Sequence, residues 1–168
     1  MSNDTLASTP IDLFAVAPQL MKRWGALSAA TGEALDPILR GLVETRASQI
    51  NGCASCLNMH TTWAREHGET EQRLYLLPAW REARHLYSER EQAALAWTEA
   101  LTRLSEGHTH EKALKELQMH FTEEEQVALT LVINVINGWN RLTVGFGLFI
   151  DPAEARAQSA TFAPQAAA

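Results

Sequence analysis

The chain has 168 residues, of which 46% are hydrophobic and 20% charged, a composition typical of an ordinary globular protein and not of a disordered or fibrous one. Its 14 Lys and Arg against 20 Asp and Glu give a formal net charge of -6, which repels polyanions, so we expect neither nucleic acid nor an acidic membrane surface as a partner. A chain of this length is expected to form one domain and to fold without a structural disulfide or metal.

The beginning of the chain shows no export signal. Residues 1–11 contain Asp4 and no Lys or Arg, and the apolar run of a secretory signal does not follow. The longest apolar stretch, residues 131–150, is interrupted by three Asn and by Arg141, so it predicts a buried helix and not a membrane span. We therefore expect a cytoplasmic protein in a reducing compartment, where a CxxC pair is more often redox-active or metal-binding than structural.

Almost the whole chain has the apolar periodicity of α-helices, and no stretch of four or more residues alternates as a strand does. Asp36 and Pro37 predict an N-cap and a first helical residue, and Asn51-Gly52 ends that helix. Other helices are expected over residues 11–30, 53–67, 70 to about 78, 88–107, 110–120 and 122–146. The prediction is an all-α single domain, with a helical extension at 1–35, a core at 36–150, and a short helix and frayed tail at 151–168.

Two helix starts carry the capping-box pattern, in which a Ser or Thr is followed three residues later by Glu. They are Ser88 with Glu91, and Thr122 with Glu125. Pro78 should kink or end the helix that begins near residue 70.

The segment SQINGCASCLNMH, residues 48–60, contains both cysteines of the chain and a histidine. At 100° per residue, both cysteines and both histidines of this helix fall on its apolar, inward face. The predicted inward set is Met59, Trp63, Cys56, His67, His60, Cys53, Ala64 and Leu57.

Two features could activate a thiol here. Cys53 lies at the helix start, where unpaired N–H groups and the helix dipole favour an anion, and His60 lies four residues after Cys56, within reach of its side chain. A thiol with a pKa near 8.5 is only about 3% thiolate at pH 7, whereas a pKa near 7 makes it about half thiolate. Cysteines three apart can also close a disulfide, so one can attack a substrate and the other resolve the intermediate.

Three other interpretations of the cysteine helix stay open. The cysteines could be two small core residues. They could bind zinc with His60, although structural zinc takes four ligands and His67, seven residues further on, would have to be the fourth. The pair could also act as a stoichiometric redox sensor and not as an enzyme.

The cysteine segment, with TTWAREHGETEQRLYLLPAW, SEREQAALAWTEALT and INGWNRL further on, resembles the alkylhydroperoxidase D (AhpD)-like branch of the carboxymuconolactone decarboxylase superfamily. The similarity extends from about Asp36 to about Phe146. It implies a helical bundle built on a helical hairpin, assembled as a homotrimer or hexamer. It also implies reduction of a small-molecule hydroperoxide by the CxxC pair, which a dithiol such as a lipoylated protein then re-reduces.

By this resemblance Cys56 attacks the peroxide, Cys53 resolves the intermediate and His60 belongs to a proton relay, with no metal or organic cofactor required. The family's relay glutamate lies twelve residues before the first cysteine, where this chain has Gly41. Glu44 is the nearest acid, displaced along the helix by about 60° and about 4.5 Å, and is the candidate substitute.

Polar residues also fall on two apolar helix faces. Arg46 lies in the middle of the apolar arc of its helix, so we expect it to bind a carboxylate or carbonyl groups. Asn134, Asn137 and Arg141 recur at intervals of three and four, a polar stripe that should satisfy partner groups inside a bundle or an interface.

Overall fold

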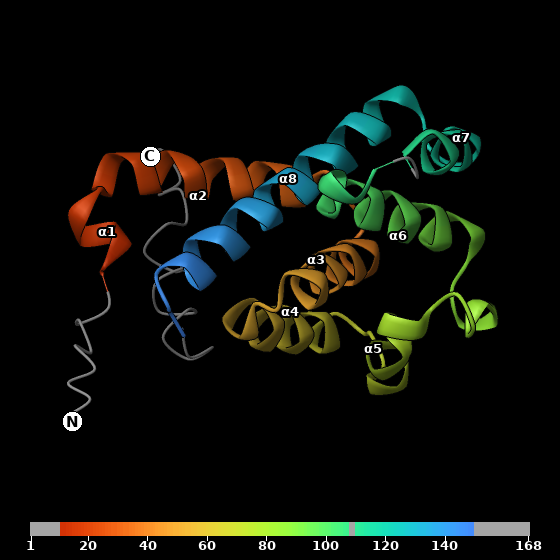
Figure 1. Ribbon diagram of the computed structural model, residues 1–168, viewed down its shortest axis with the longest axis horizontal. Helices are drawn as coiled ribbons and strands as arrows, with labels where there is room; N and C mark the ends of the chain where they lie inside the picture. Colours follow the sequence, from red (N-terminus) through yellow and green to blue (C-terminus); the bar gives the residue numbers. More distant parts are fainter. Residues whose placement is uncertain (1–10, 108–109, 150–168) are drawn as a thin grey trace, which may run out of the picture.

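The computed structural model describes residues 11–107 and 110–149, and these ranges contain helices and turns but no strand (Figure 1). The α-helices are α1 (Leu13–Val16), α2 (Pro18–Glu33), α3 (Pro37–Asn51), α4 (Ala54–Glu66), α5 (Glu71–Leu76), α6 (Glu89–Thr102), α7 (His110–His120) and α8 (Glu123–Gly145). Short 3₁₀ helices span Leu77–Ala79, Arg84–Leu86 and Leu104–Glu106. The predicted all-α single domain is confirmed, whereas the short helix and tail predicted for 151–168 lie outside the described residues.

Helix boundaries follow local sequence signals. The side chain of Asp36 accepts hydrogen bonds from the N–H groups of Ile38 and Leu39 at 3.0 and 3.1 Å, which starts α3 as predicted. Both predicted capping boxes, at the starts of α6 and α8, are present. After Leu76 the chain tightens into the 3₁₀ helix that contains Pro78, so α5 ends where the proline pattern indicated.

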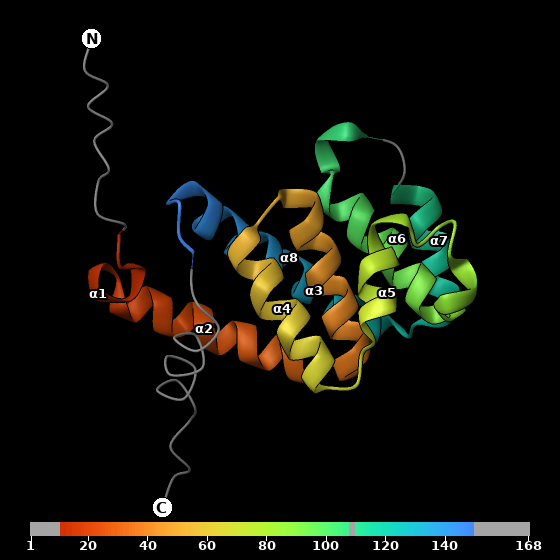
Figure 2. The same cartoon turned by 90° about the horizontal axis from the view of Figure 1, so that it is seen from below.

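Helix α3 lies at the centre of the molecule, with α4, α6 and α8 packed around it (Figures 1 and 2). Its residues Leu42, Val43 and Ala47 have no exposed surface. Two larger apolar clusters join α3 to α6 and to the helices beyond it. On its other side α3 forms an antiparallel hairpin with α4, and the turn between them carries the first cysteine.

Arg46 has a carboxylate partner, as predicted, and the structure identifies it as Glu99 of α6. Arg46 and Glu99 are both 7% exposed, and the Nε atom of Arg46 donates to Oε1 of Glu99 at 2.7 Å. The indole N–H of Trp80 donates to the same oxygen at 3.0 Å, and Arg81 donates to the other one. Burial alone would raise the pKa of Glu99, but its arginine and tryptophan partners outweigh burial and lower it.

Candidate active site

Cys53 forms the cap of α4. Gly52 closes α3 with a φ of 65°, a left-handed conformation that is natural for glycine. Cys53 follows in an extended conformation, and its sulfur accepts a hydrogen bond from the N–H of Cys56 at 3.3 Å. We expected Cys53 in the first turn of the helix. It is the N-cap instead, so its sulfur faces the unpaired N–H groups of the helix start.

The two cysteines are joined in a disulfide, with their Cα atoms 5.4 Å apart. Cys53 is 1% exposed and Cys56 is 3% exposed. Ala47, Ile136 and Trp139 pack against the pair. The sulfur atoms are therefore shielded from large oxidants and lie in mainly apolar surroundings.

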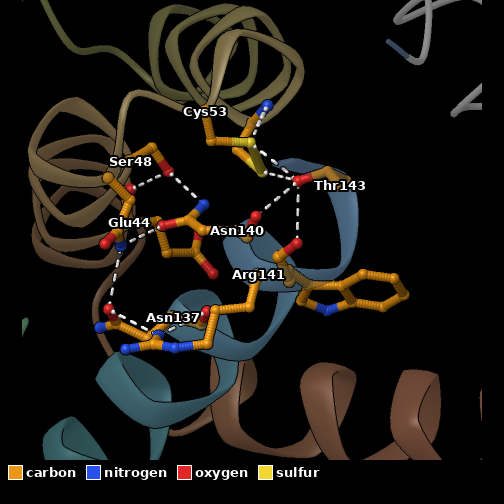
Figure 3. Close-up of a disulfide and its surroundings, with 10 residues drawn as sticks. Glu44, Ser48, Cys53, Asn137, Asn140, Arg141 and Thr143 are labelled. Atoms are coloured by element: carbon orange, nitrogen blue, oxygen red, sulfur yellow. Dashed lines mark hydrogen bonds between the residues drawn. A yellow bond between two sulfur atoms is a disulfide. The ribbon is translucent and has the colours of Figure 1, made fainter. Parts of the chain in front are cut away.

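Thr143 of α8 contacts both sulfur atoms (Figure 3). Its Oγ1 lies 2.9 Å from Sγ of Cys53 and 3.4 Å from Sγ of Cys56. The same hydroxyl lies 2.8 Å from the carbonyl oxygen of Trp139 and 3.2 Å from that of Asn140. Sequence reasoning missed Thr143, which is 90 residues from Cys53 along the chain.

The buried polar stripe of α8 differs from the predicted one. Asn134 is exposed, whereas Asn137, Asn140 and Thr143, at intervals of three, are buried and face the end of α3. Arg141 is exposed and bonds back to the carbonyl oxygen of Asn137 at 2.8 Å. Asn137 and Asn140 are three residues apart, and the same interval leads on to Thr143, so this spacing could have identified Thr143 as part of the stripe.

This stripe holds the turn before the cysteines in place (Figure 3). The side-chain amide of Asn51 donates to the side-chain oxygens of Asn137 and Asn140 at 2.9 and 2.8 Å. Asn140 donates in turn to Oγ of Ser48 at 3.1 Å. A buried network of satisfied amides is rigid, so the cysteine turn is positioned by α8 as well as by its own helices.

A carboxylate and an imidazole meet beside the cysteine helix. Oε2 of Glu44 lies 3.0 Å from Nδ1 of His60 and 3.1 Å from Nε of Arg40. Glu44 is 5% exposed and His60 is 6% exposed. Burial alone would raise the pKa of Glu44, but His60 and Arg40 outweigh burial and hold it below its ordinary value. Glu44 is therefore an anion that binds the Nδ1 side of His60.

Gly41 lies at a point where α3 and α4 approach each other closely. A Cβ atom there would lie 2.9 Å from Cβ of Ala64, which is closer than packed side chains allow. A glutamate at position 41 would therefore require α4 to move away. Glu44, three residues further along, lies where its carboxylate reaches His60.

The predicted inward face of α4 is only partly correct, because Ser55, which lies outside it, is also buried. Cys53, Cys56, His60 and Ala64 are buried, but Met59 is 37% exposed. His67 is exposed and stacks on the ring of Trp63, with ring centroids 3.9 Å apart. The cause is that α4 packs chiefly against α3 and the end of α8, which cover a narrower stripe than the apolar residues occupy.

Within residues 11–107 and 110–149, no group of three or more His, Cys, Asp or Glu side chains has the arrangement of a metal site. No helix in this part of the chain combines the length and the apolar character needed to cross a membrane.

The ion pairs of Glu44 with His60 and Arg40 predict a pH-dependent stability. Because its pKa is lowered in the folded state, the unfolded chain takes up a proton first as the pH falls. The stabilising contribution is complete above the ordinary value of 4.5 and is lost as the pH falls below it. Urea unfolding between about pH 7 and pH 3 should therefore show a smaller acid loss in Glu44→Gln than in the parent. Glu116→Gln, on the side of α7, is the matched control, and parallel profiles for the parent and Glu44→Gln would contradict the prediction.

The chain is similar in sequence to a family of known proteins and to one of their relatives. The sequence model of the carboxymuconolactone decarboxylase family matches residues 18–100. The uncharacterized protein YdfG of Bacillus subtilis is 38% identical over 141 residues, which cover 83% of this chain and 95% of that protein.

Solved structures share the fold. One is a protein of unknown function from Agrobacterium tumefaciens, proposed to be the antioxidant defence protein AhpD. It is 36% identical, with a TM-score of 0.80, and the match covers 86% of this chain and 99% of that one. The debrominase Bmp8 in complex with 2,3,4-tribromopyrrole is 20% identical, with a TM-score of 0.74 over 89% of this chain and 80% of that one. At that identity Bmp8 supports the fold alone.

Proposed function

The chain belongs to the carboxymuconolactone decarboxylase family, in its AhpD-like branch, and from this premise we propose that it is a thiol-dependent peroxidase that a dithiol reduces. The observation that carries the proposal is the buried Cys53–Cys56 pair, followed on the same face of α4 by a histidine that a carboxylate holds. A disulfide and its reduced dithiol differ by two electrons, which is what reduction of one peroxide requires.

His60 is arranged to take a proton from a thiol. Glu44 binds its Nδ1 side, so the lone pair of the neutral ring lies on Nε2. This Nε2 atom is buried and has no hydrogen-bond partner among the described residues. Because His60 lies four residues after Cys56, its ring is on the side of α4 that carries the second cysteine.

The proposed oxidation begins when His60 accepts the proton of the Cys56 thiol. The Cys56 thiolate attacks the outer peroxide oxygen, the O–O bond breaks, and the departing alkoxide takes the proton from His60 as an alcohol. Cys56 is then a sulfenic acid. Cys53 then loses its thiol proton, its thiolate attacks the sulfur of Cys56 and displaces hydroxide, and that proton converts the hydroxide to water as the disulfide forms.

Turnover tests this proposal against the redox-sensor alternative. The parent protein is mixed with an organic hydroperoxide and excess dihydrolipoamide, and peroxide is followed over time. Repeated turnover, with many equivalents of peroxide consumed per subunit, supports an enzyme. Consumption that stops at one equivalent while the dithiol remains would establish a stoichiometric sensor.

Glu44→Gln should lower kcat/KM for the hydroperoxide by about a hundredfold, because proton transfer by a positioned acid–base group typically contributes at least that much. Glutamine keeps the size and a hydrogen bond but no longer stabilises the imidazolium. The measurement is the steady-state rate across pH in the parent, Glu44→Gln and the control Glu116→Gln. Equal rates for Glu44→Gln and the parent would exclude Glu44 from the relay.

We also propose that the protein works as a homo-oligomer, with three or six subunits, in the cytoplasm. Helix α1 and the first part of α2 extend beyond the other helices (Figure 2). Large apolar side chains there are open to solvent, including Val16 at 74% and Leu20 at 70% exposure. They border an apolar groove of about 630 Å³ that also includes Phe146 near the end of α8. Exposed apolar surface of this kind is typical of subunit contacts, and light scattering of the purified protein measures the subunit number.

A further inference from the structure

We propose that Cys53 is the sulfur that leaves as a thiolate when the disulfide is reduced, that the hydroxyl of Thr143 donates to it, and that the incoming thiol therefore attacks Cys56. This inference rests on the proposed function only in taking a thiol as the reductant. It assigns a catalytic role to Thr143 and a direction to the reductive half of the cycle.

The hydroxyl of Thr143 has one proton and four acceptors around it. They are the carbonyl oxygens of Trp139 and Asn140, at 2.8 and 3.2 Å, and the two sulfur atoms, at 2.9 and 3.4 Å. A disulfide sulfur is a weak acceptor, so in the oxidised protein the Thr143 hydroxyl donates to the carbonyl oxygens. A thiolate is an anion and a much stronger acceptor. Rotation about one C–O bond then turns the proton to sulfur, without movement of any heavier atom.

The hydrogen bond from Thr143 to sulfur differs in strength between the disulfide and the transition state of its cleavage. It is weak in the disulfide and strengthens as negative charge develops on the leaving sulfur, which is the condition for an interaction to lower a barrier. When the leaving cysteine later becomes a thiol, its S–H can donate to Thr143 Oγ1 while the hydroxyl proton returns to the carbonyl oxygen of Trp139. The leaving cysteine thus has a hydrogen-bonded arrangement as a disulfide sulfur, as a thiolate and as a thiol.

The surroundings of the two sulfur atoms are not equal. Oγ1 of Thr143 lies 2.9 Å from Sγ of Cys53 and 3.4 Å from Sγ of Cys56, so it is nearer to Cys53. Its sulfur also accepts the N–H of Cys56 and sits at the start of α4, where the helix dipole favours an anion. Both residues are almost fully buried, so exposure does not choose between them. The more stabilised thiolate is the better leaving group in disulfide exchange, and that is Cys53.

The chemical step balances as follows. A donor thiolate forms a bond to Sγ of Cys56, the Cys53–Cys56 bond breaks, and its electron pair leaves on Cys53. The second thiol of the donor, as a thiolate, attacks its own sulfur in the mixed disulfide and releases Cys56. The donor is oxidised by two electrons to a disulfide, and its two protons end on the two cysteines.

The site of attack is read directly by mass spectrometry. The oxidised parent protein is treated with 2-mercaptoethanol, quenched with acid at short times, and alkylated with N-ethylmaleimide before digestion with trypsin. Both cysteines fall in one tryptic peptide, residues 47–65, and fragmentation between them locates each group. We expect the mercaptoethanol adduct mainly on Cys56 and maleimide mainly on Cys53. An adduct mainly on Cys53, or equal amounts on both, overturns the proposal.

The role of Thr143 is read by three substitutions. Thr143→Val should slow disulfide cleavage by 2-mercaptoethanol about tenfold, since a hydrogen bond to a charged group is of that order, and should reduce the preference for Cys56. Thr143→Ser keeps the hydroxyl and should restore both. Thr98→Val is the matched control, because Thr98 is also buried and donates to the carbonyl four residues before it, on a different helix. A Thr143→Val rate within twofold of the parent overturns the role.

These tests use stoichiometric cleavage and no peroxide. A protein that fails to turn over peroxide but shows the adduct on Cys56 would refute the proposed function and support this inference. Peroxide turnover with the adduct on Cys53 would do the opposite.

Discussion

Cys56→Ser is expected to abolish peroxide consumption, to at least a thousandfold below the parent rate. A serine hydroxyl is not ionised near neutral pH and cannot form a sulfenic acid or a disulfide, so both half-reactions are lost. Cys53→Ser should differ in kind, because Cys56 can still attack but no neighbouring thiol resolves the sulfenic acid. Stopped-flow measurement of peroxide should show about one equivalent consumed rapidly by Cys53→Ser, and none by Cys56→Ser.

Exposed methionines are the background to exclude in that experiment. Met59 is 37% exposed, three residues from Cys56, and methionine sulfur also consumes peroxide. Met59→Leu should therefore leave the catalysed rate unchanged. If Cys56→Ser retained the rapid equivalent and Cys53→Ser lost it, the roles of the two cysteines would be reversed. If both matched the parent, the cysteine mechanism would be excluded.

Glu99→Ala is expected to lower the free energy of unfolding by about 3–5 kcal/mol, the usual cost of removing one partner of a buried ion pair. The alanine leaves Arg46, 7% exposed, with an uncompensated charge in the core between α3 and α6. It also removes the acceptor of the buried Trp80 N–H. Urea unfolding at neutral pH measures the loss.

The control for Glu99→Ala is a glutamate in an exposed pair. Glu116 lies 4.0 Å from Lys112, whose side chain is 85% exposed, and such pairs contribute roughly 0–1 kcal/mol. Glu116→Ala should therefore change the free energy of unfolding by less than about 1 kcal/mol. A similar small change in Glu99→Ala would show that water or another group compensates Arg46.

The sequence by itself determined the features that depend on neighbours in the chain. Asp36, Gly52 and the two capping boxes act on backbone groups within four residues, so helix starts and ends could be assigned without a structure. The closeness of Cys53 and Cys56 follows in the same way from their spacing on one helix start. The length, composition and motif of the chain were also sufficient for its all-α class and its family resemblance.

Only the tertiary structure decided the groups that surround the cysteines. The sequence left open whether Glu44 could reach His60 from a position three residues after Gly41, and the close packing of α3 on α4 brings the two side chains together. Thr143 reaches the sulfur atoms because α8 crosses the end of α3, a contact between residues 90 positions apart. The exposure of His67 likewise depends on how little of α4 its neighbours cover. Local sequence determines which face a helix can bury, whereas the packing of its neighbours determines how much of that face is buried and what it touches.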